Sequence, residues 1–178
     1  ADRTWLARVS SEKRAASSSR LACQFQDITC SSNSHLGKAR PVSEWAALGV
    51  VPRSGAFAAR NLMANVILPQ GRNGPAFLTY PNFDVYFEWN QSFIYVTTAA
   101  YFATRLEGAQ IFDAGTPDVG LTGPEMKQLQ TLLESYGYDV GDIDGILGAK
   151  TRLAIQDVQQ RLGLPADAWP TPALLNQL

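Results

Sequence analysis

Residues 137–148 read Gly-Tyr-Asp-Val-Gly-Asp-Ile-Asp-Gly-Ile-Leu-Gly, and this stretch determines how the C-terminal part of the chain is organised. Glycine adopts the positive φ angles of sharp turns at little cost, and it commonly ends a helix. We therefore predict that Gly137 ends one helix and that Asp144-Gly145 forms a tight turn. Gly148 then stands at the start of a second helix.

Helical patterns flank this turn on both sides. Thr122 can cap the first helix, Pro124 has the φ angle of a first turn, and Glu125 complements the helix dipole. The apolar positions expected to face a core are Met126, Leu129, Leu132 and Leu133 before the turn, and Ile146, Leu153, Ile155, Val158, Leu162 and Leu164 after it. With a short last helix over residues 172–177, residues 122–178 are predicted to form a three-helix unit.

Residues 109–121 separate this unit from the preceding part of the chain. They include Gly115, Pro117 and Gly120, which is a linker composition. Before the linker, the patterns predict a helix over 41–50 with Ser43 as its cap, strands over 65–68, 76–80 and 83–87, and a helix over 90–106. The predicted fold class is therefore α+β: a small antiparallel sheet with helices, followed by the three-helix unit.

Residues 1–39 are polar and irregular, and they contain both cysteines of the chain. Cys23 and Cys30 close a short loop rich in serine, and a local disulfide that pins this segment is the favoured interpretation. A zinc site is disfavoured, because Cys23, Cys30 and His35 supply at most three ligands, so no metal site is predicted. A cysteine nucleophile with His35 as its base is conceivable, but no Asn or Asp is placed recognisably to orient the histidine.

Composition and charge restrict the class of protein. Of the 178 residues, 46% are hydrophobic and 17% are charged, which is typical of a chain that folds around a core. The net charge is −1, so nucleic acid is not an expected partner. No stretch reaches the roughly 20 apolar residues that cross a bilayer. The first residues lead into no signal peptide, so we expect a mature or trimmed product or a chain that starts inside a longer one.

The three-helix unit resembles the peptidoglycan-binding domain of bacterial wall hydrolases. The landmarks, in order, are Leu129-Gln130, Leu132-Leu133, residues 137–141, residues 144–148, Thr151, Ala154-Ile155, Gln159 and Gly163-Leu164. Most of these residues explain a turn or a core, so the function comes from the resemblance. Ligand contacts are expected on the exposed rim, and our candidates are Tyr136, Tyr138, Asp139 and Asp142. The alternative for each is a loop residue that only packs or is solvated.

A second resemblance covers residues 40–108. Residues 40–50, Leu68-Pro69-Gln70-Gly71, residues 74–78, Asn82-Phe83 and residues 89–95 are similar to the lytic murein transglycosylase B family. In that family this region follows the main catalytic lobe, and a peptidoglycan-binding domain often ends the chain. The resemblance implies a periplasmic protein of the bacterial cell envelope, whose ligand is peptidoglycan through its glycan strand or its stem peptide.

The resemblance also implies a chemistry. The family cleaves the glycan between N-acetylmuramic acid and N-acetylglucosamine without water, and it leaves a 1,6-anhydro end. Asn90 and Ser92 would lie beside the active-site cleft, and Trp89 and Tyr95 could stack on sugar rings. The structural alternative is a helix start, with Asn90 as its cap and with Trp89 and Tyr95 in the core.

The catalytic glutamate is where this chain departs from the family. That residue belongs to a Glu-Ser-x-aromatic-Gly pattern in the upstream lobe, and it needs a raised pKa to act as an acid. Glu134-Ser135-Tyr136-Gly137 is one residue short of the pattern and ends a predicted helix, and Glu88 does not match the catalytic position. No catalytic residue is assigned, and residues 40–108 are expected to be a remnant that lacks the catalytic lobe.

Three interpretations follow. The chain could be the C-terminal portion of a lytic transglycosylase, inactive without its catalytic lobe. It could instead be a stand-alone, non-catalytic envelope subunit that binds or scaffolds, derived from such an enzyme. An independent enzyme that uses Cys23 and His35 has the least support. No cofactor is implied, and the expected protein partner is a separate catalytic lobe or an envelope complex.

Overall fold

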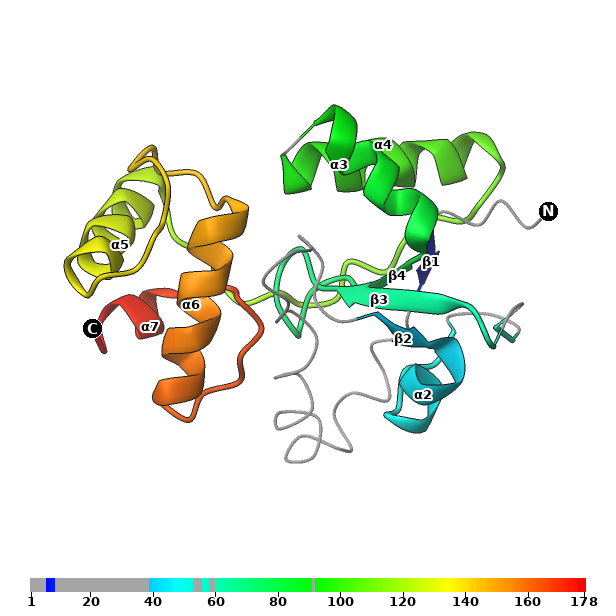
Figure 1. Ribbon diagram of the computed structural model, residues 1–178, viewed down its shortest axis with the longest axis horizontal. Helices are drawn as coiled ribbons and strands as arrows, with labels where there is room; N and C mark the ends of the chain where they lie inside the picture. Colours follow the sequence, from blue (N-terminus) through cyan, green and yellow to red (C-terminus); the bar gives the residue numbers. More distant parts are fainter. Residues whose placement is uncertain (1–5, 9–38, 53–55, 58–59, 91) are drawn as a thin grey trace.

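The computed structural model describes residues 6–8, 39–52, 56–57, 60–90 and 92–178 (Figure 1). The expected disulfide between Cys23 and Cys30 lies outside these residues, as does His35. The elements are β1 (Leu6–Arg8), β2 (Arg40–Pro41), α2 (Val42–Ala47), β3 (Met63–Ile67), β4 (Phe77–Thr79), η3 (Pro81–Phe83), α3 (Asp84–Trp89), α4 (Phe93–Leu106), α5 (Gly123–Ser135), α6 (Ala149–Arg161) and α7 (Pro172–Leu175). No helix in the described part is both long enough and apolar enough to cross a membrane.

An antiparallel sheet of four strands forms the centre of the N-terminal unit. Its strand order is β1-β4-β3-β2. Val66 of β3 pairs with Leu78 of β4, and Ile67 pairs with Phe77. The strands predicted over 65–68 and 76–80 are thus found as β3 and β4, and the predicted α+β class is confirmed.

Each face of the sheet carries its own apolar cluster, because successive side chains of a strand point to opposite faces. Val66 and Leu78 pack with Trp45 of α2 on one face. Ile67 and Phe77 pack with α3 and α4 on the other face. Figure 1 shows the sheet between α2 and the α3–α4 pair. Trp45 is 1% exposed, and its indole N–H donates to a β3 carbonyl at 2.8 Å, so burial leaves no unpaired donor.

The strand predicted over residues 83–87 is wrong, since this segment forms the end of η3 and the start of α3. Phe83 and Phe87 belong to one buried cluster, whereas Val85 between them is 59% exposed. A strand would turn all three side chains to the same face. The observed burial therefore requires the i, i+4 spacing of a helix.

Two predicted helix starts are also corrected. α2 begins at Val42 directly after Pro41, so Ser43 lies in the first turn and does not cap the helix. A side-chain cap is unnecessary because the first N–H groups of α2, those of Val42 and Ser43, donate to the carbonyls of Leu62 and Arg60 at 3.0 and 2.9 Å. α4 begins at Phe93 and not at residue 90, and Ser92 is its N-cap.

The C-terminal unit contains the three predicted helices α5, α6 and α7. Leu129, Leu133 and Ile155 are fully buried at its centre. The Glu125 carboxylate accepts from both the backbone N–H and the hydroxyl of Thr122, each at 2.7 Å. These bonds confirm the predicted start of α5.

The turn predicted at Asp144-Gly145 is present, and the buried Gln130 of α5 holds it. The Gln130 amide donates to the carbonyls of Asp142 and Ile146 and to the carboxylate of Asp144, at 3.1–3.2 Å. Its oxygen accepts from the N–H of Gly145 at 2.8 Å. Gly145 has a φ of +82°, which favours glycine at this position.

Part of the predicted core of this unit is wrong. Ile146, Leu153 and Leu162 are 61%, 46% and 42% exposed. Leu153 lies two residues before the buried Ile155, which is about 200° around the helix. Gln156 and Gln159 are buried instead, and their amides donate to carbonyls in the loop before α7.

The linker, residues 109–121, lies against both units. The indole N–H of Trp169 donates to the Asp118 carbonyl at 2.9 Å, and the Asn73 amide donates to the Asp118 carboxylate at 3.1 Å. Arg152 of α6 crosses directly to the carbonyl of Pro69 at 2.9 Å. The two units are therefore docked through polar bonds from the linker and from both sides.

Candidate functional site

The junction of α3 and α4 carries the four residues expected beside a glycan cleft. α3 ends at Trp89, and Asn90 is extended with φ −146° and ψ 125°. The Asn90 side-chain oxygen accepts from the N–H of Ser92 at 2.8 Å, and the Ser92 hydroxyl accepts from the N–H of Tyr95 at 3.4 Å. These two bonds turn the chain and bring the rings of Trp89 and Tyr95 together.

Trp89 and Tyr95 form an exposed aromatic pair. Their ring centroids are 5.4 Å apart with 59° between the planes, and the side chains are 67% and 49% exposed. The alternative that places both rings in the core and makes Asn90 the helix cap is therefore wrong, because the rings are exposed and the N-cap of α4 is Ser92. Asn90 instead accepts a bond from the N–H of Ser92, just before the helix. An exposed ring with a polar edge can stack on an apolar ligand face and donate a hydrogen bond at the same time.

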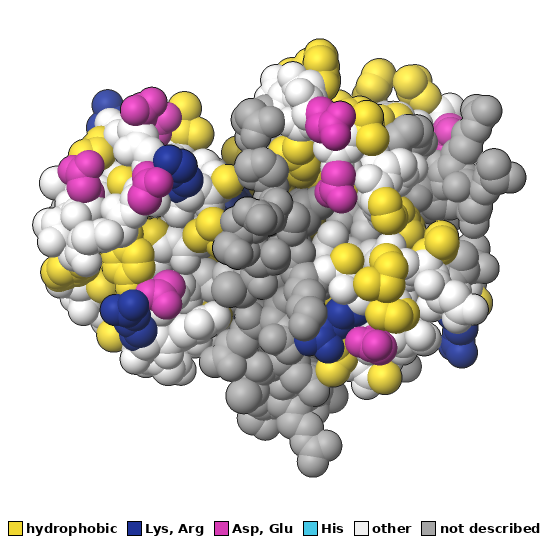
Figure 2. All heavy atoms as spheres, viewed as in Figure 1, with side chains coloured by type: hydrophobic (Ala, Val, Ile, Leu, Met, Phe, Trp, Pro, Cys, Tyr) yellow, Lys and Arg dark blue, Asp and Glu magenta, His cyan; other side chains and the backbone are white. Residues whose placement is uncertain are grey.

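Further apolar side chains extend this surface. Val85 of α3 and Ile94 of α4 are 59% and 58% exposed. Hydrophobic side chains gather over α3 and α4 at the upper edge of the space-filling view (Figure 2). A concentration of exposed apolar groups beside polar ones is typical of a binding surface.

The rim candidates of the C-terminal unit lie on the loop after α5, and both tyrosines have internal partners. The Tyr136 hydroxyl donates to the carbonyl of Leu178 at 2.7 Å, while the side chain is 54% exposed. The Tyr138 hydroxyl donates to the Asp157 carboxylate at 2.5 Å, and the Arg161 guanidinium lies 5.6 Å from its ring. Burial, followed by the bond to Asp157, raises the pKa of Tyr138. Tyr138 is thus half-buried and largely structural, and Tyr136 offers the more accessible ring.

The two aspartates of this loop differ in the same way. Asp139 forms an ion pair with Lys150 of α6 at 2.7 Å, and its other oxygen accepts from the N–H of Gly141 at 3.1 Å. The Lys150 bond, followed by the Gly141 bond, lowers the pKa of Asp139. Asp142 is exposed, and its backbone carbonyl anchors the Gln130 amide. Both aspartates are exposed, but the Asp139 carboxylate is engaged by Lys150 and by Gly141.

The structure does not bring the two sets of predicted site residues together. Trp89, Asn90, Ser92 and Tyr95 lie at the α3–α4 junction of one unit, and residues 136–142 lie on the other unit (Figure 1). A ligand that contacts both sets must span both units, as an extended polymer does.

Neither glutamate considered in the sequence lies in an apolar cleft. Glu88 is exposed near the end of α3, and Glu134 is exposed near the end of α5. A general acid needs surroundings that disfavour the charged carboxylate. The surroundings of these two residues do not provide that burial.

A feature that the sequence did not reveal lies between the units. A cavity of about 640 Å³ is lined by α4 and the 69–77 loop on one side and by α6 and Trp169 on the other. Thr97 and Arg152 line the cavity, and each has a buried polar atom without a hydrogen-bond partner among the described residues. Neither residue belongs to a recognisable sequence motif. The signal was absent from the sequence because the cavity exists only when the two units dock.

Comparison with known proteins assigns both units. The transglycosylase SLT domain family matches residues 9–104, and the peptidoglycan binding domain family matches residues 122–178. The chain belongs to the transglycosylase SLT domain family. The SLT match starts at residue 9, whereas the family resemblance seen in the sequence starts at residue 40. The match ends at residue 104, close to the predicted linker. The peptidoglycan-binding resemblance is confirmed over the whole three-helix unit.

Two solved structures of one protein are similar to this SLT-family chain over nearly its whole length. The chain is similar to SltB3 from Pseudomonas aeruginosa, solved in complex with NAG-anhNAM-pentapeptide, at a TM-score of 0.68 and 30% identity. The similarity covers 99% of this chain but 45% of SltB3. A second SltB3 structure, in complex with NAG-NAM-pentapeptide, matches at a TM-score of 0.69 and 31% identity.

A curated relative matches a smaller part of the chain. The spore cortex-lytic enzyme of Bacillus cereus is 30% identical over 63 residues, which is 35% of this chain and 24% of that enzyme. The chain thus spans less than half the length of each of these relatives. An SLT domain followed by a peptidoglycan-binding domain makes this a cell-wall-acting protein of the envelope.

Proposed function

We propose that this chain binds peptidoglycan in the periplasm, as the C-terminal portion of a lytic murein transglycosylase whose catalytic lobe lies outside these 178 residues. One observation carries the proposal: the chain is similar over 99% of its length to SltB3, which was solved with a peptidoglycan fragment. In this proposal the chain alone holds murein, and the acid that cleaves it is supplied by the absent lobe.

The α3–α4 junction is the proposed glycan wall. Trp89 and Tyr95 present ring surface to sugar faces, which are apolar on the C–H side. Because the Asn90 oxygen is already held by the Ser92 N–H, the amide nitrogen is oriented to donate to an N-acetyl carbonyl. The Ser92 hydroxyl lies at the same edge and adds a second polar contact.

The loop after α5 is the proposed second contact region. Tyr136, Asp139 and Asp142 are its exposed members. Tyr138 completes the candidate set, and the bonds of Tyr138 and Asp139 to α6 fix the shape of the loop. In the cell wall this loop could contact either the glycan strand or the stem peptide of peptidoglycan.

Retention on purified sacculi tests the proposal, with soluble products analysed by mass spectrometry. We expect the chain to be retained and no anhydro-muropeptides to be released. Trp89→Ala should weaken retention severalfold, because it removes the larger stacking ring. Phe102→Ala is the matched control, since Phe102 is an exposed aromatic residue on the same helix α4, at 61% exposure. An equal loss of retention for both variants would overturn the glycan wall. Failure of the unaltered chain to be retained on sacculi would overturn the whole proposal.

A stand-alone, non-catalytic envelope subunit is the second candidate function. It predicts the same retention on sacculi. The discriminating observation is the open reading frame: an upstream Glu-Ser-x-aromatic-Gly lobe in the same frame excludes this candidate. Conversely, release of anhydro-muropeptides by the chain itself would contradict both candidates, and Glu88 and Glu134 would then be mutated first.

A further inference from the structure

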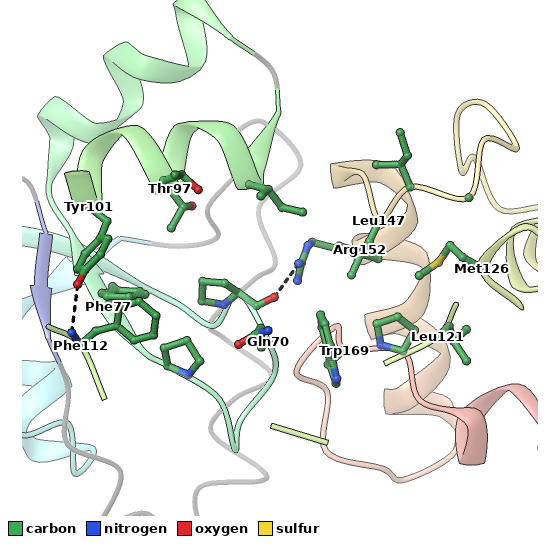
Figure 3. Close-up of a pocket in the computed structure, with 17 residues that line it drawn as sticks. Gln70, Phe77, Thr97, Tyr101, Phe112, Leu121, Met126, Leu147, Arg152 and Trp169 are labelled. Atoms are coloured by element: carbon green, nitrogen blue, oxygen red, sulfur yellow. Dashed lines mark hydrogen bonds between the residues drawn. The ribbon is translucent and has the colours of Figure 1, made fainter. Parts of the chain in front are cut away.

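The cavity between the two units is built from both of them (Figure 3). Phe77 and Tyr101 of the N-terminal unit form one apolar wall, and Trp169 and Leu147 of the C-terminal unit form the facing wall. Its volume, about 640 Å³, lies within the roughly 300–1,000 Å³ of sites that bind small ligands. A cavity of this size and lining can enclose most of a short peptide.

The cation that lines this cavity, Arg152, forms no ion pair among the described residues, and the carboxylate of Asp167 acts on its charge from farther away. The Arg152 guanidinium donates one hydrogen bond to the Pro69 carbonyl and lies 4.7 Å from the ring centroid of Phe93. Its Nε is buried and has no hydrogen-bond partner within the part of the chain that is described, and no carboxylate there forms an ion pair with it. Burial lowers the pKa of Arg152 to about 10, although the nearby Asp167 carboxylate acts to raise it, so the group stays charged at neutral pH. A desolvated cation of this kind is complementary to an anionic ligand group.

A second polar group in the cavity also has no partner among the described residues. Thr97 is 8% exposed, and its hydroxyl is buried without a hydrogen bond. Figure 3 shows its side chain directed from α4 into the space that Arg152 faces from α6. Unsatisfied buried polar groups are rare in folded proteins, and a ligand or an ordered water in this cavity can supply the partners of these two.

The lining selects between the two parts of peptidoglycan. A glycan carries hydroxyl groups all round its rings, and each would lose its water without a replacement here. The cavity offers few polar side chains besides Gln70, Thr97, Thr98 and Arg152. The D-Ala-D-Ala end of a stem peptide has methyl side chains and a terminal carboxylate, which suits apolar walls with one cation.

We propose that this cavity binds the stem peptide of peptidoglycan, with its terminal carboxylate at Arg152 and a hydrogen bond from Thr97; this rests on peptidoglycan being the ligand of the chain. Because both units contribute, the docked arrangement is part of the site. The stem peptide then binds between the units, while the glycan is held at the Trp89–Tyr95 pair.

Calorimetric titration of the full chain tests this with the pentapeptide L-Ala-γ-D-Glu-L-Lys-D-Ala-D-Ala and with the same peptide amidated at its C-terminus. We expect the free acid to bind about tenfold more tightly than the amide, the usual size of a charge-assisted hydrogen bond. Arg152→Met should bind both forms equally. Arg161→Met, which removes the same charge from the same helix outside the cavity, should keep the tenfold ratio.

The ratio of acid to amide affinity makes the test independent of small changes in docking. Equal affinities in the unaltered chain, or a tenfold ratio that persists in Arg152→Met, would overturn the proposal. Binding of octanoate without binding of either peptide would identify a lipid site instead. If the chain is retained on sacculi but binds no peptide, this cavity is rejected as the site and the proposed function stands. If the chain neither binds the peptide nor is retained on sacculi, both the cavity site and the proposed function are rejected.

Thr97→Val provides a second, independent measurement. Removing an unpartnered buried hydroxyl should raise the thermal midpoint of the free chain, because the cost of burying it disappears. If the hydroxyl serves the ligand, the same variant should bind the pentapeptide about threefold more weakly. A raised midpoint with unchanged peptide affinity would remove Thr97 from the site.

Discussion

The two units of this chain are stabilised in different ways. The N-terminal unit is a thin sheet between two apolar clusters, and its burial is mostly aromatic and aliphatic. The C-terminal unit has one apolar cluster, but buried glutamines of α5 and α6 also hold the loops that connect its helices. Stability of the first unit therefore depends on volume and shape, and stability of the second depends also on hydrogen bonds that cannot be exchanged with water.

This difference bears on how function can be inferred. In the C-terminal unit, the residues by which its family is identified, such as Gln130 and Gly145, are the ones that form its turns. In the N-terminal unit, Trp89 and Tyr95 are exposed and are not required by either cluster. Residues that folding does not need are better guides to a ligand than those that it does.

The largest effect is expected from Trp45→Ala in the N-terminal unit. It leaves a cavity in the cluster and removes the hydrogen bond from the indole to the Ala64 carbonyl, and it should lower the free energy of unfolding by about 4 kcal/mol. Trp89→Ala is the matched control at a 67% exposed site, and its effect should stay within about 0.5 kcal/mol. Amide hydrogen exchange should show faster opening of residues 40–108 for the first variant only. A comparable loss for both would mean that the aromatic pair is structural.

Gln130→Met tests the other side of the comparison. Methionine has a similar volume, but the carbonyls of Asp142 and Ile146 lose their donor, and the N–H of Gly145 loses its acceptor. We expect about 3 kcal/mol of destabilisation, confined to the C-terminal unit. Gln128→Met, at an exposed position of the same helix, is the control. If Gln130→Met were as stable as its control, the C-terminal unit would be held by apolar packing alone.

The sequence predicted the C-terminal unit better than the N-terminal one, for a physical reason. Caps and glycine turns are local, so Thr122 with Glu125 and Asp144 with Gly145 could be recognised from their neighbours alone. Strand and short helix are both compatible with the run from 83 to 87, and only packing against the sheet decides between them. At Phe83–Phe87 the residue types favour a strand, but the packing of Phe83 and Phe87 in one cluster selects a helix instead.

The candidate site was only partly accessible to sequence reasoning. The aromatic pair at the α3–α4 junction was proposed as a ligand contact through a resemblance, and its exposure, which the structure shows, was not predictable from spacing. The inward direction predicted for Leu153 is wrong, because an apolar pattern gives no sign that the polar side chains of Gln156 and Gln159 are buried on that helix. The interunit cavity had no local signal, since Thr97 and Arg152 are 55 positions apart and meet only after docking.

Docking itself can be weakened at one glycine. A Cβ at Gly120 would lie 2.7 Å from the Trp169 ring, whereas a Cβ at Gly123 would meet nothing within 4 Å. Gly120→Ala should therefore separate the linker from Trp169 at a cost of about 2 kcal/mol, and Gly123→Ala should not. Small-angle scattering should show a larger radius of gyration for the first variant alone. An unchanged radius for Gly120→Ala would mean that the ring moves aside and that the units stay docked without this contact.

The smallest expected effect is a dependence on acidity that belongs to the C-terminal unit. Hydrogen bonds from Thr122 lower the pKa of Glu125, and bonds from the Ile146 N–H and then Gln130 lower the pKa of Asp144, below ordinary values of 4.5 and 3.8. A carboxyl with a lowered folded pKa contributes stability above its unfolded pKa, and this is lost as pH falls through the folded value. The thermal midpoint of the C-terminal unit should thus decline below about pH 4.5. Asp144→Asn should flatten part of that decline, and Glu134→Gln, at an exposed position, should leave it unchanged. A decline of equal slope in Asp144→Asn would show that the charge of this carboxylate does not stabilise the turn, and that the buried amide of Gln130 holds it alone.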